Sequence, residues 1–338
     1  MRVAVIGAGS MGGMHADLLG DMEGVERLFI VDPDAARAEE VARRAGATVV
    51  TFQQAVEGAD ALIIATPPEL HRPAVEAALD AGRHVLCEKP LTESLGSTIA
   101  LTGRIEEAGA HLELGFQRRH DAGFLAARTS AAGRIHLVRL TAHDPLGQAR
   151  PAPSGAPPEV APIFRDSSIH DFDVVRWLTG QEVVEVAVEA GRRDGSRPVD
   201  PRDIESTIVT MRLSGGTLAV LEASWLHPAG YDIRIELISE TGAISAGLSP
   251  RTPSRHADWT DATGTTDGWS GYLERFEAAY RDELVSFLDS CRGVRPPSST
   301  ARDGLEAMRI AVAATRSHVE GRGVHLDEIA GLARAGVA

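Results

Sequence analysis

The stretch VAVIGAGSMG, residues 3–12, decides how the first part of this chain folds. Four apolar residues, typical of a buried strand, lead into a G-x-G-x-x-G spacing, and an apolar-periodic helix follows. Alone the spacing is a weak signal, since glycine occurs 34 times among 338 residues. The flanking strand and helix make it strong, because these glycines let backbone N–H groups at the positive helix end approach a pyrophosphate. The turn predicts a dinucleotide contact through Gly7, Gly9, Ser10, Met11 and Gly12; a glycine turn without a ligand is the weaker alternative.

A carboxylate stands at the end of the next apolar run. Asp32 follows Gly12 by about 20 residues, the spacing at which a carboxylate accepts hydrogen bonds from the adenosine ribose hydroxyls. A 2′-phosphate would be repelled there, and no arginine follows immediately, so NAD is favoured over NADP. Asp34 is interpreted as the cap of the following helix.

The pattern of the first 118 residues alternates between short apolar runs and helical stretches. Strands are expected at 3–6, 28–31, 48–50, 61–65, 84–87 and 111–115, and helices at 11–19, 35–44, 53–57, 69–81 and 92–108, the last capped by Thr92. Short apolar strands between helices indicate parallel pairing that is covered on both faces. Residues 1–118 are therefore predicted to be an NAD-binding domain of the doubly wound, Rossmann type.

Residues 119–338 follow a different pattern. Period-two strands are expected at 134–141, 183–190, 204–213, 217–226 and 232–238, with helices at 169–179, 272–290 and 301–320. Such strands indicate an α+β domain with a large open, mostly antiparallel sheet. Helices cover one face, and the other needs solvent or a second subunit. The Pro- and Ala-rich stretch 148–162 is expected to be a loop.

Composition excludes several classes of protein. The net charge of −14 argues against a nucleic-acid partner. No apolar run is long enough for a signal peptide or a membrane span, so no membrane partner is expected. Two distant cysteines form neither a disulfide framework nor a zinc cluster, and no metal is expected. These features favour a cytoplasmic protein.

Polar residues follow two of the predicted parallel strands. Thr66 and Pro67 come after one, and the run Glu88-Lys89-Pro90 comes after the next. Ligands of such sheets bind outside the carboxyl ends of the strands, so these residues are expected to contact the dinucleotide. Pro90 lacks an N–H and stops the strand, which directs Lys89 towards the nicotinamide; a solvated loop is the alternative.

His71 lies on the helix predicted at 69–81. It either faces the dinucleotide or lies on the surface of that helix.

The run from Asp166 to Asp173 contains a second cluster. Asp166, His170 and Asp173 share one face if they lie on a single helix. Three interpretations compete: a helix cap with a satisfied histidine, a metal site, and a general base with an orienting carboxylate. Together with a nicotinamide cofactor, the third is favoured: His170 removes a hydroxyl proton, Lys89 stabilises the developing alkoxide, and Asp166 orients substrate or histidine.

These residues together resemble the glucose–fructose oxidoreductase/inositol dehydrogenase family, most of all its inositol 2-dehydrogenases. The resemblance rests on GAGSMG with Asp32, on Thr66-Pro67, on Glu88-Lys89-Pro90 and on the Asp-x-x-x-His run. It implies a Rossmann domain followed by an open-sheet domain, polyol substrates, and dimers or tetramers joined through that sheet. It also implies that Lys89, Asp166 and His170 form the catalytic group and that the bond before Pro90 is cis.

The resemblance extends to residues around the substrate. Gln117 takes an Asn-like position near the nicotinamide, and Asp144 stands where inositol dehydrogenases carry a substrate-binding Asn before Pro. That departure leaves the preferred polyol open. Tyr231, at the start of a predicted strand, either reaches the substrate or packs.

Four functions remain in competition at this point. The favoured one is NAD-dependent oxidation of a ring secondary alcohol of a polyol, myo-inositol or a related cyclitol, by a homotetramer or dimer. A pyranose dehydrogenase is the second, and a hydrolase that uses NAD as a tethered redox aid is the third. The fourth is an inactive NAD-sensing regulator, against which the presence of Lys89 and His170 argues.

Overall fold

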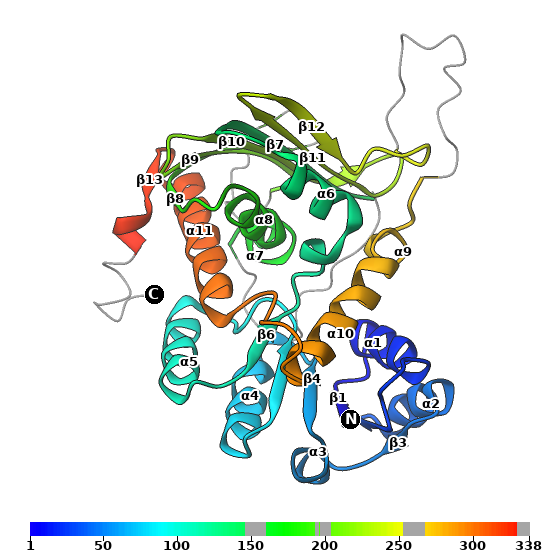
Figure 1. Cartoon of the computed structure of the whole chain (residues 1–338). Coiled ribbons are helices and arrows are strands. Elements are labelled where there is room, and N and C mark those ends of the chain that lie inside the picture. The colour runs from blue at the N-terminus through cyan, green and yellow to red at the C-terminus, as the bar shows by residue number, and fades with distance from the viewer. Residues whose placement is uncertain (146–159, 193–195, 197–203, 253–267, 330–338) are drawn as a thin grey trace. The chain divides into compact units, whose positions relative to one another are not determined.

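The computed structural model describes residues 1–145, 160–192, 196, 204–252 and 268–329 (Figure 1). The chain forms two compact units. The first comprises Met1–His120 and Ala278–Glu306, and the second comprises the described parts of Asp121–Glu277 and Ala307–Ala335. The sequence predicted one boundary, at residue 118; the compact units place it after His120 and return a later segment to the first unit. Most of the predicted loop at 148–162 lies outside the described residues.

The first unit contains a six-stranded, wholly parallel sheet in the order β3-β2-β1-β4-β5-β6. Its strands are β1 (Arg2–Ile6), β2 (Arg27–Val31), β3 (Thr48–Val49), β4 (Ala61–Ile64), β5 (His84–Cys87) and β6 (Leu112–Leu114). Every residue of β4 is buried, as expected for a strand covered on both faces. Strand order reverses between β1 and β4, which is the point where such sheets bind ligands. The predicted doubly wound sheet is confirmed.

The helices between these strands are α1 (Ser10–Gly20), α2 (Ala35–Ala45), α3 (Phe52–Gly58), α4 (His71–Asp80) and α5 (Leu95–Ala108). Asp34 caps α2 as predicted, accepting a hydrogen bond from the Arg37 N–H. The predicted cap Thr92 is wrong: Ser94 caps α5, and Thr92 is buried with its hydroxyl 2.7 Å from that of Thr98. A short 3₁₀ turn, η1 (Pro68–Leu70), precedes α4.

A later part of the chain completes the first unit. It contains most of α10 (Glu277–Cys291) and the first turn of α11 (Ala301–Glu320). Hydrogen bonds attach it to β6: Ser299 accepts from the Leu114 N–H at 2.9 Å, and the Ser298 N–H donates to Glu113 at 3.0 Å. The helix predicted at 272–290 is divided into α9 (Tyr272–Arg275) and α10, with Phe276 between them.

The second unit contains a seven-stranded sheet in the order β12-β11-β7-β10-β9-β8-β13. Its strands are β7 (Ile135–Pro145), β8 (Val183–Gly191), β9 (Ser206–Leu213), β10 (Leu218–His227), β11 (Asp232–Ser239), β12 (Gly242–Ala246) and β13 (Val324–His325). Among the described strands of this sheet only the β7–β10 pair is parallel, which confirms the mostly antiparallel prediction. The short strands β12 and β13 were not predicted.

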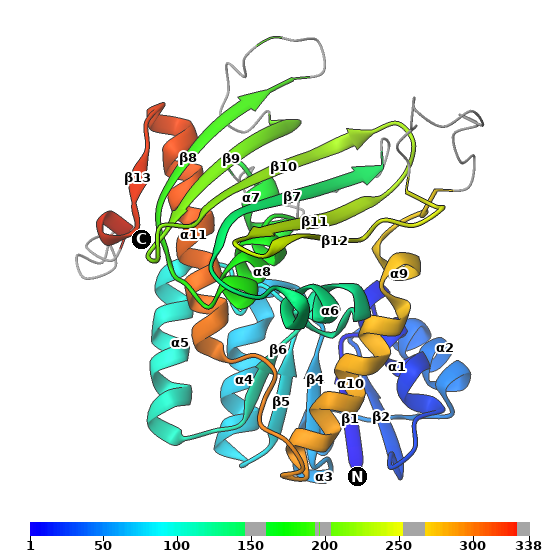
Figure 2. The same ribbon diagram turned by 45° about the horizontal axis from the view of Figure 1, so that its top comes forward.

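The two faces of this sheet differ. Helices α6 (Ala122–Ser130), α8 (Ile169–Thr179) and the second-unit part of α11 lie on one side of it (Figure 2). Burial alternates along β9 and β10 accordingly: Leu221 is buried towards the helices, whereas Leu218 is 45% and Ile208 42% exposed on the other face. Among the described residues no helix covers that open face. No helix in the described ranges is long and apolar enough to span a membrane.

Candidate active site

Three glycines shape the turn between β1 and α1, each for a different reason. Gly7 has a φ of 96°, which favours glycine. A Cβ on Gly12 would lie 1.8 Å from the carbonyl oxygen of Gly7, so only glycine lets the helix pack this closely. A Cβ on Gly9, by contrast, would meet no protein atom within 4 Å. Packing therefore requires Gly7 and Gly12, while Gly9 leaves the open approach that a pyrophosphate needs.

Asp32, directly after β2, is held beside this turn. Its Oδ2 accepts from the Ala8 N–H at 2.7 Å, and its Oδ1 accepts from the Asp34 N–H at 2.8 Å and from Arg37 at 2.6 Å. Burial works to raise the pKa of Asp32, but the hydrogen bonds from Arg37, Ala8 and Asp34 outweigh it and hold the pKa below its usual range. An ionised acceptor thus stands where the adenosine ribose is expected. The sequence missed Arg37, which is exposed and pairs with this carboxylate.

The loops after β4, β5 and β6 present further polar groups at the same edge of the sheet. Thr66 Oγ1 and Gln117 Oε1 are buried, and neither has a hydrogen-bond partner among the described residues. Such orphaned atoms fit a site that a polar ligand completes. The Lys89–Pro90 bond is cis, as the resemblance implied. Together with the open approach at Gly9, these residues fit a dinucleotide.

His71 holds the two loops together. Its ring is fully buried, with Nε2 2.8 Å from the Thr66 carbonyl oxygen and Nδ1 2.8 Å from the Pro90 carbonyl oxygen. Burial lowers the pKa of His71, although the two carbonyl oxygens only accept hydrogen bonds and work to raise it. The imidazole faces protein backbone, neither solvent nor the outside of α4.

Glu88 also points into the protein. Its Oε1 lies 2.7 Å from Nε2 of His15, a fully buried residue of α1 whose ring makes an edge contact with Tyr280. Burial, with added repulsion from Glu88 and Glu113, raises the pKa of Glu283 well above its usual range, so this carboxyl is protonated. The sequence carried no signal for His15 or Glu283, because their spacing from Glu88 follows no motif.

The Asp-x-x-x-His run lies in the second unit, on two short helices. Asp166 ends α7 (Ile163–Asp166), whereas His170 lies in the first turn of α8. Asp166 and His170 do not lie on one helix, because the chain turns at Ser167 and Ser168 between α7 and α8. Helix α8 itself has the predicted bounds and ends at Gly180 in the left-handed conformation. His170 is 9% exposed, and Asp173 is fully buried.

The end of β7 reaches the same two helices. Asp144 accepts a hydrogen bond from the Ser167 hydroxyl at 3.1 Å, and Trp225 donates its indole N–H to that hydroxyl at 2.8 Å. Ser167 and Trp225 were missed by the sequence analysis. Tyr231 is 5% exposed, forms a bridge with Trp269 and packs its ring edge-on against Phe276. Asp144 thus lies beside the α7–α8 turn, and Tyr231 directly precedes Asp232, which pairs with His143 at the same end of β7.

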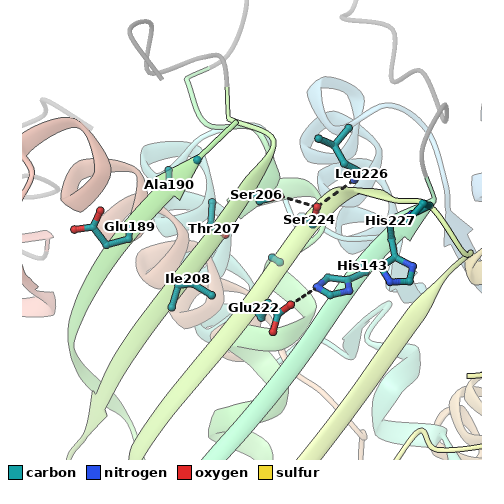
Figure 3. A pocket seen from close by; sticks show the side chains of 13 residues that line it. His143, Glu189, Ala190, Ser206, Thr207, Ile208, Glu222, Ser224, Leu226 and His227 are labelled. Atoms are coloured by element: carbon teal, nitrogen blue, oxygen red, sulfur yellow. Dashed lines mark hydrogen bonds and ion pairs between the residues drawn. The ribbon is translucent and has the colours of Figure 1, made fainter. Parts of the chain in front are cut away.

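A pocket of about 400 Å³ opens in the second unit, over the ends of β7 to β10 (Figure 3). Its lining contains none of the site residues that the sequence predicted. His143 and His227 stack there with ring centroids 5.0 Å apart, and Glu222 lies 3.0 Å from Nε2 of His143. Alternation along β7 places His143 on the face opposite to its neighbour Asp144.

The parallel sheet, the glycine turn and the Asp32 carboxylate beside it define a dinucleotide-binding protein of the Rossmann class. The model of the GFO/IDH/MocA oxidoreductase family, with an NAD-binding Rossmann fold, matches residues 1–116. The model of the GFO/IDH/MocA C-terminal domain matches residues 126–245. The chain belongs to this family of NAD-dependent oxidoreductases.

Relatives in this family cover nearly the whole chain. A myo-inositol dehydrogenase of Streptomyces leeuwenhoekii is 38% identical over 330 residues, which cover 95% of this chain and 98% of that protein. A myo-inositol 2-dehydrogenase of Thermotoga maritima is 31% identical, with 98% and 100% covered. The crystal structure of a Lactobacillus casei myo-inositol dehydrogenase with NAD(H) and myo-inositol matches with a TM-score of 0.82 at 25% identity, over 96% of each chain.

Proposed function

We propose that this chain oxidises a ring secondary alcohol of a cyclitol, myo-inositol or a close relative, by hydride transfer to NAD. The observation that carries the proposal is the Lys89–Pro90 corner, fixed by His71 at the same sheet edge as the glycine turn and Asp32. The relatives support it, since they are named as inositol dehydrogenases and match this chain over nearly their full length.

The first unit supplies the residues that hold the coenzyme. Gly9 caps α1 and has no side chain to accept hydrogen bonds from the first N–H groups of this helix. These N–H groups bind the pyrophosphate. Asp32 accepts from the ribose, and Thr66, Pro67 and Gln117 line the nicotinamide half. Bound NAD supplies the hydride acceptor. Glu88 and His71 contribute by fixing the corner that carries Lys89.

Three residues carry the proton and charge. His170 takes the proton from the substrate hydroxyl as the hydride leaves the carbon that bears this hydroxyl. The Lys89 ammonium stabilises the charge that develops on the oxygen, and Asp166 orients the substrate or His170. Because Lys89 belongs to the first unit and His170 to the second, the mechanism requires that both reach one hydroxyl. Asp144, positioned by Ser167, is proposed to select among ring hydroxyls, with Tyr231 supporting the wall of the site.

The direct test incubates the protein with NAD and a panel of cyclitols and pyranoses while the absorbance of reduced NAD is followed. Turnover of myo-inositol or another cyclitol above that of every pyranose is the expected result. Faster turnover of a pyranose would favour a sugar dehydrogenase. Binding of NAD without turnover of any polyol would favour the regulator and refute the proposal.

We also propose a cytoplasmic homo-oligomer, a dimer or tetramer joined through the open face of the second sheet. The exposed apolar side chains Ile208 and Leu218 on that face support it, and both cysteines are free thiols, as suits a reducing compartment. Light scattering on the wild type should give the mass of a dimer or tetramer, and Leu218→Glu should lower it. A monomeric wild type would rule the interface out.

A further inference from the structure

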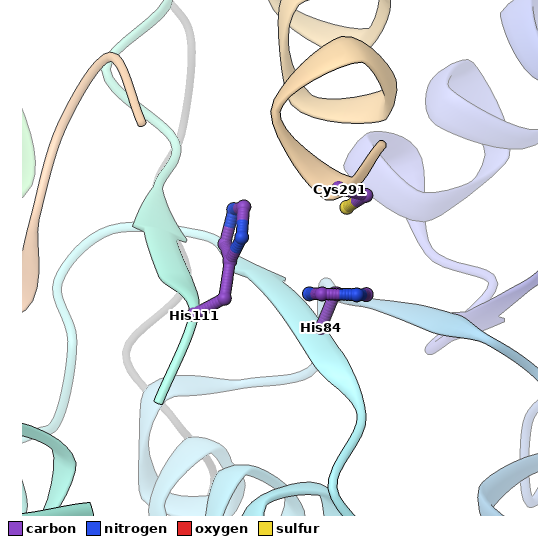
Figure 4. A group of neighbouring side chains, drawn as sticks. All are labelled: His84, His111 and Cys291. Atoms are coloured by element: carbon purple, nitrogen blue, oxygen red, sulfur yellow. The ribbon is translucent and has the colours of Figure 1, made fainter. Parts of the chain in front are cut away.

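Three side chains with metal-binding atoms meet at the amino edge of the parallel sheet. His84 is the first residue of β5, His111 directly precedes β6, and Cys291 is the last residue of α10. One nitrogen or sulfur atom from each lies within 4.8 Å of the other two. Figure 4 shows both imidazoles and the thiol around one space between the strands and the end of the helix. All three residues are partly exposed, so an ion can enter from solvent.

Neighbouring hydrogen bonds indicate which ring nitrogen of His111 carries its proton. The Ser290 hydroxyl donates to Oε1 of Glu113. The same hydroxyl lies 3.0 Å from Nε2 of His111 and accepts the hydrogen bond from that N–H, because its own proton is used. The Nδ1 atom of His111 then carries the lone pair.

From this arrangement we infer that His84, His111 and Cys291 form a zinc-binding site, with water in the fourth position. Two imidazoles and a thiolate are ligands that Zn²⁺ prefers. Zinc–ligand bonds of about 2.0–2.3 Å in a tetrahedron separate ligand atoms by roughly 3.5 Å, so small side-chain rotations close the site. The Glu113–Ser290–His111 chain supplies the outer hydrogen bonds that orient a ligating imidazole.

The position of the site indicates its role. An ion there ties the end of α10, and with it the returning segment of the first unit, to β5 and β6. Strand β5 spans only four residues, roughly 13 Å, and the coenzyme binds beyond its other end. The bound metal therefore stabilises the first unit and takes no part in hydride transfer.

A second histidine group, His143, His227 and Asp232, offers an internal control. Its two imidazoles are stacked with only 20° between their planes, so their lone pairs point in parallel directions and do not converge on one ion. The rings of His84 and His111 instead meet at 79°.

The test titrates metal-free protein with Co²⁺, which reports a bound thiolate by a charge-transfer band in the near ultraviolet, and repeats the titration with Zn²⁺ in competition. One equivalent of Co²⁺ should bind, Zn²⁺ should displace it, and the melting temperature should rise with either ion. Cys291→Ser should abolish the band, and His84→Gln should weaken binding more than tenfold. Cys87→Ala and His227→Gln serve as matched controls and should bind as the wild type does.

Two further readouts separate ligation from a merely structural role. Cysteine binds these metals as the thiolate, so binding must release the thiol proton of Cys291. The affinity for Co²⁺ should therefore rise about tenfold per pH unit between pH 7 and 9. Ser290→Ala should lower it roughly 10–100-fold through the loss of the outer hydrogen bond. Absence of one-to-one binding by folded wild type, an unchanged band in Cys291→Ser, or loss of binding in His227→Gln instead would each overturn the inference.

Discussion

The two sheets of this protein differ in how well the sequence predicts which residues lie together at the ends of their strands. In the parallel sheet the residues that follow each strand lie at the same edge. Asp32, Thr66 and Lys89 therefore share that edge although they are far apart in sequence. In the second sheet, β9 and β11 run opposite to β7 and β10, so strand ends share no edge. Its candidate catalytic residues lie instead on the α7–α8 pair. Topology alone thus predicts half of the site, and the other half depends on local packing.

The largest effects on activity should come from substituting Lys89 in the first unit and His170 in the second, the two residues on which the proposed mechanism depends. Lys89→Ala and His170→Ala should each lower kcat about 10²–10⁴-fold, because charge stabilisation or proton removal is lost. NAD affinity, measured by fluorescence titration, should stay near that of the wild type. The exposed His136→Ala is the control and should retain activity. Near-normal turnover in either active-site variant would remove that residue from the mechanism.

The glycine turn allows packing to be separated from ligand binding. Gly12→Ala should lower the free energy of unfolding by at least about 3 kcal/mol, because the new Cβ meets the Gly7 carbonyl oxygen at 1.8 Å. Gly9→Ala should leave it within about 0.5 kcal/mol, since no protein atom lies within 4 Å. Its NAD affinity should nevertheless fall more than tenfold, about 1.4 kcal/mol. Denaturant unfolding and NAD titration of both variants check this; unchanged NAD affinity in Gly9→Ala would argue against the pyrophosphate position.

The return of residues 278–306 to the first unit predicts a pH dependence of stability. Burial lowers the pKa of His120 to about 4, and its Nε2 lies 3.1 Å from the Ser298 hydroxyl. The unfolded chain binds this proton near pH 6.5 and the folded chain only near 4, so stability falls as pH drops through that window. His120→Gln should remove up to about 3 kcal/mol of that fall, measured by urea unfolding. The substitution of an exposed histidine, His136→Gln, should leave that fall unchanged. If the unfolding free energy of His120→Gln depended on pH as that of the wild type does, His120 would not be held neutral.

The smallest effects come from two carboxylates two residues apart. Asp32→Ala should weaken NAD about tenfold and relax the discrimination against NADP, because a ribose acceptor and a repelling charge are lost. Asp34→Ala should instead cost about 1 kcal/mol of unfolding free energy through the lost helix cap, with cofactor preference unchanged. Cofactor titration and thermal unfolding of both variants distinguish them. If the ratio of the affinities for NAD and NADP were unchanged in Asp32→Ala, the assignment of Asp32 to the ribose would be contradicted.

The sequence by itself determined the parallel sheet, the glycine turn, the strand-end corners and the bounds of α8. Each of these depends on residues that are neighbours in the chain or on one topological rule, and apolar periodicity reports both. The error at the start of α5 was also local: Thr92 was predicted to cap this helix, and Ser94 caps it, because either residue satisfies the same short pattern.

Only the tertiary structure decided which distant groups meet. The His71 bridge, the Glu88–His15 contact and the group of His84, His111 and Cys291 join residues whose spacing follows no motif. The physical reason is that a buried polar atom needs a partner in space, and the chain supplies it from whichever segment the packed core brings there. Sequence spacing reports neighbours within one helix or strand, and contacts between elements are set by how the core is filled.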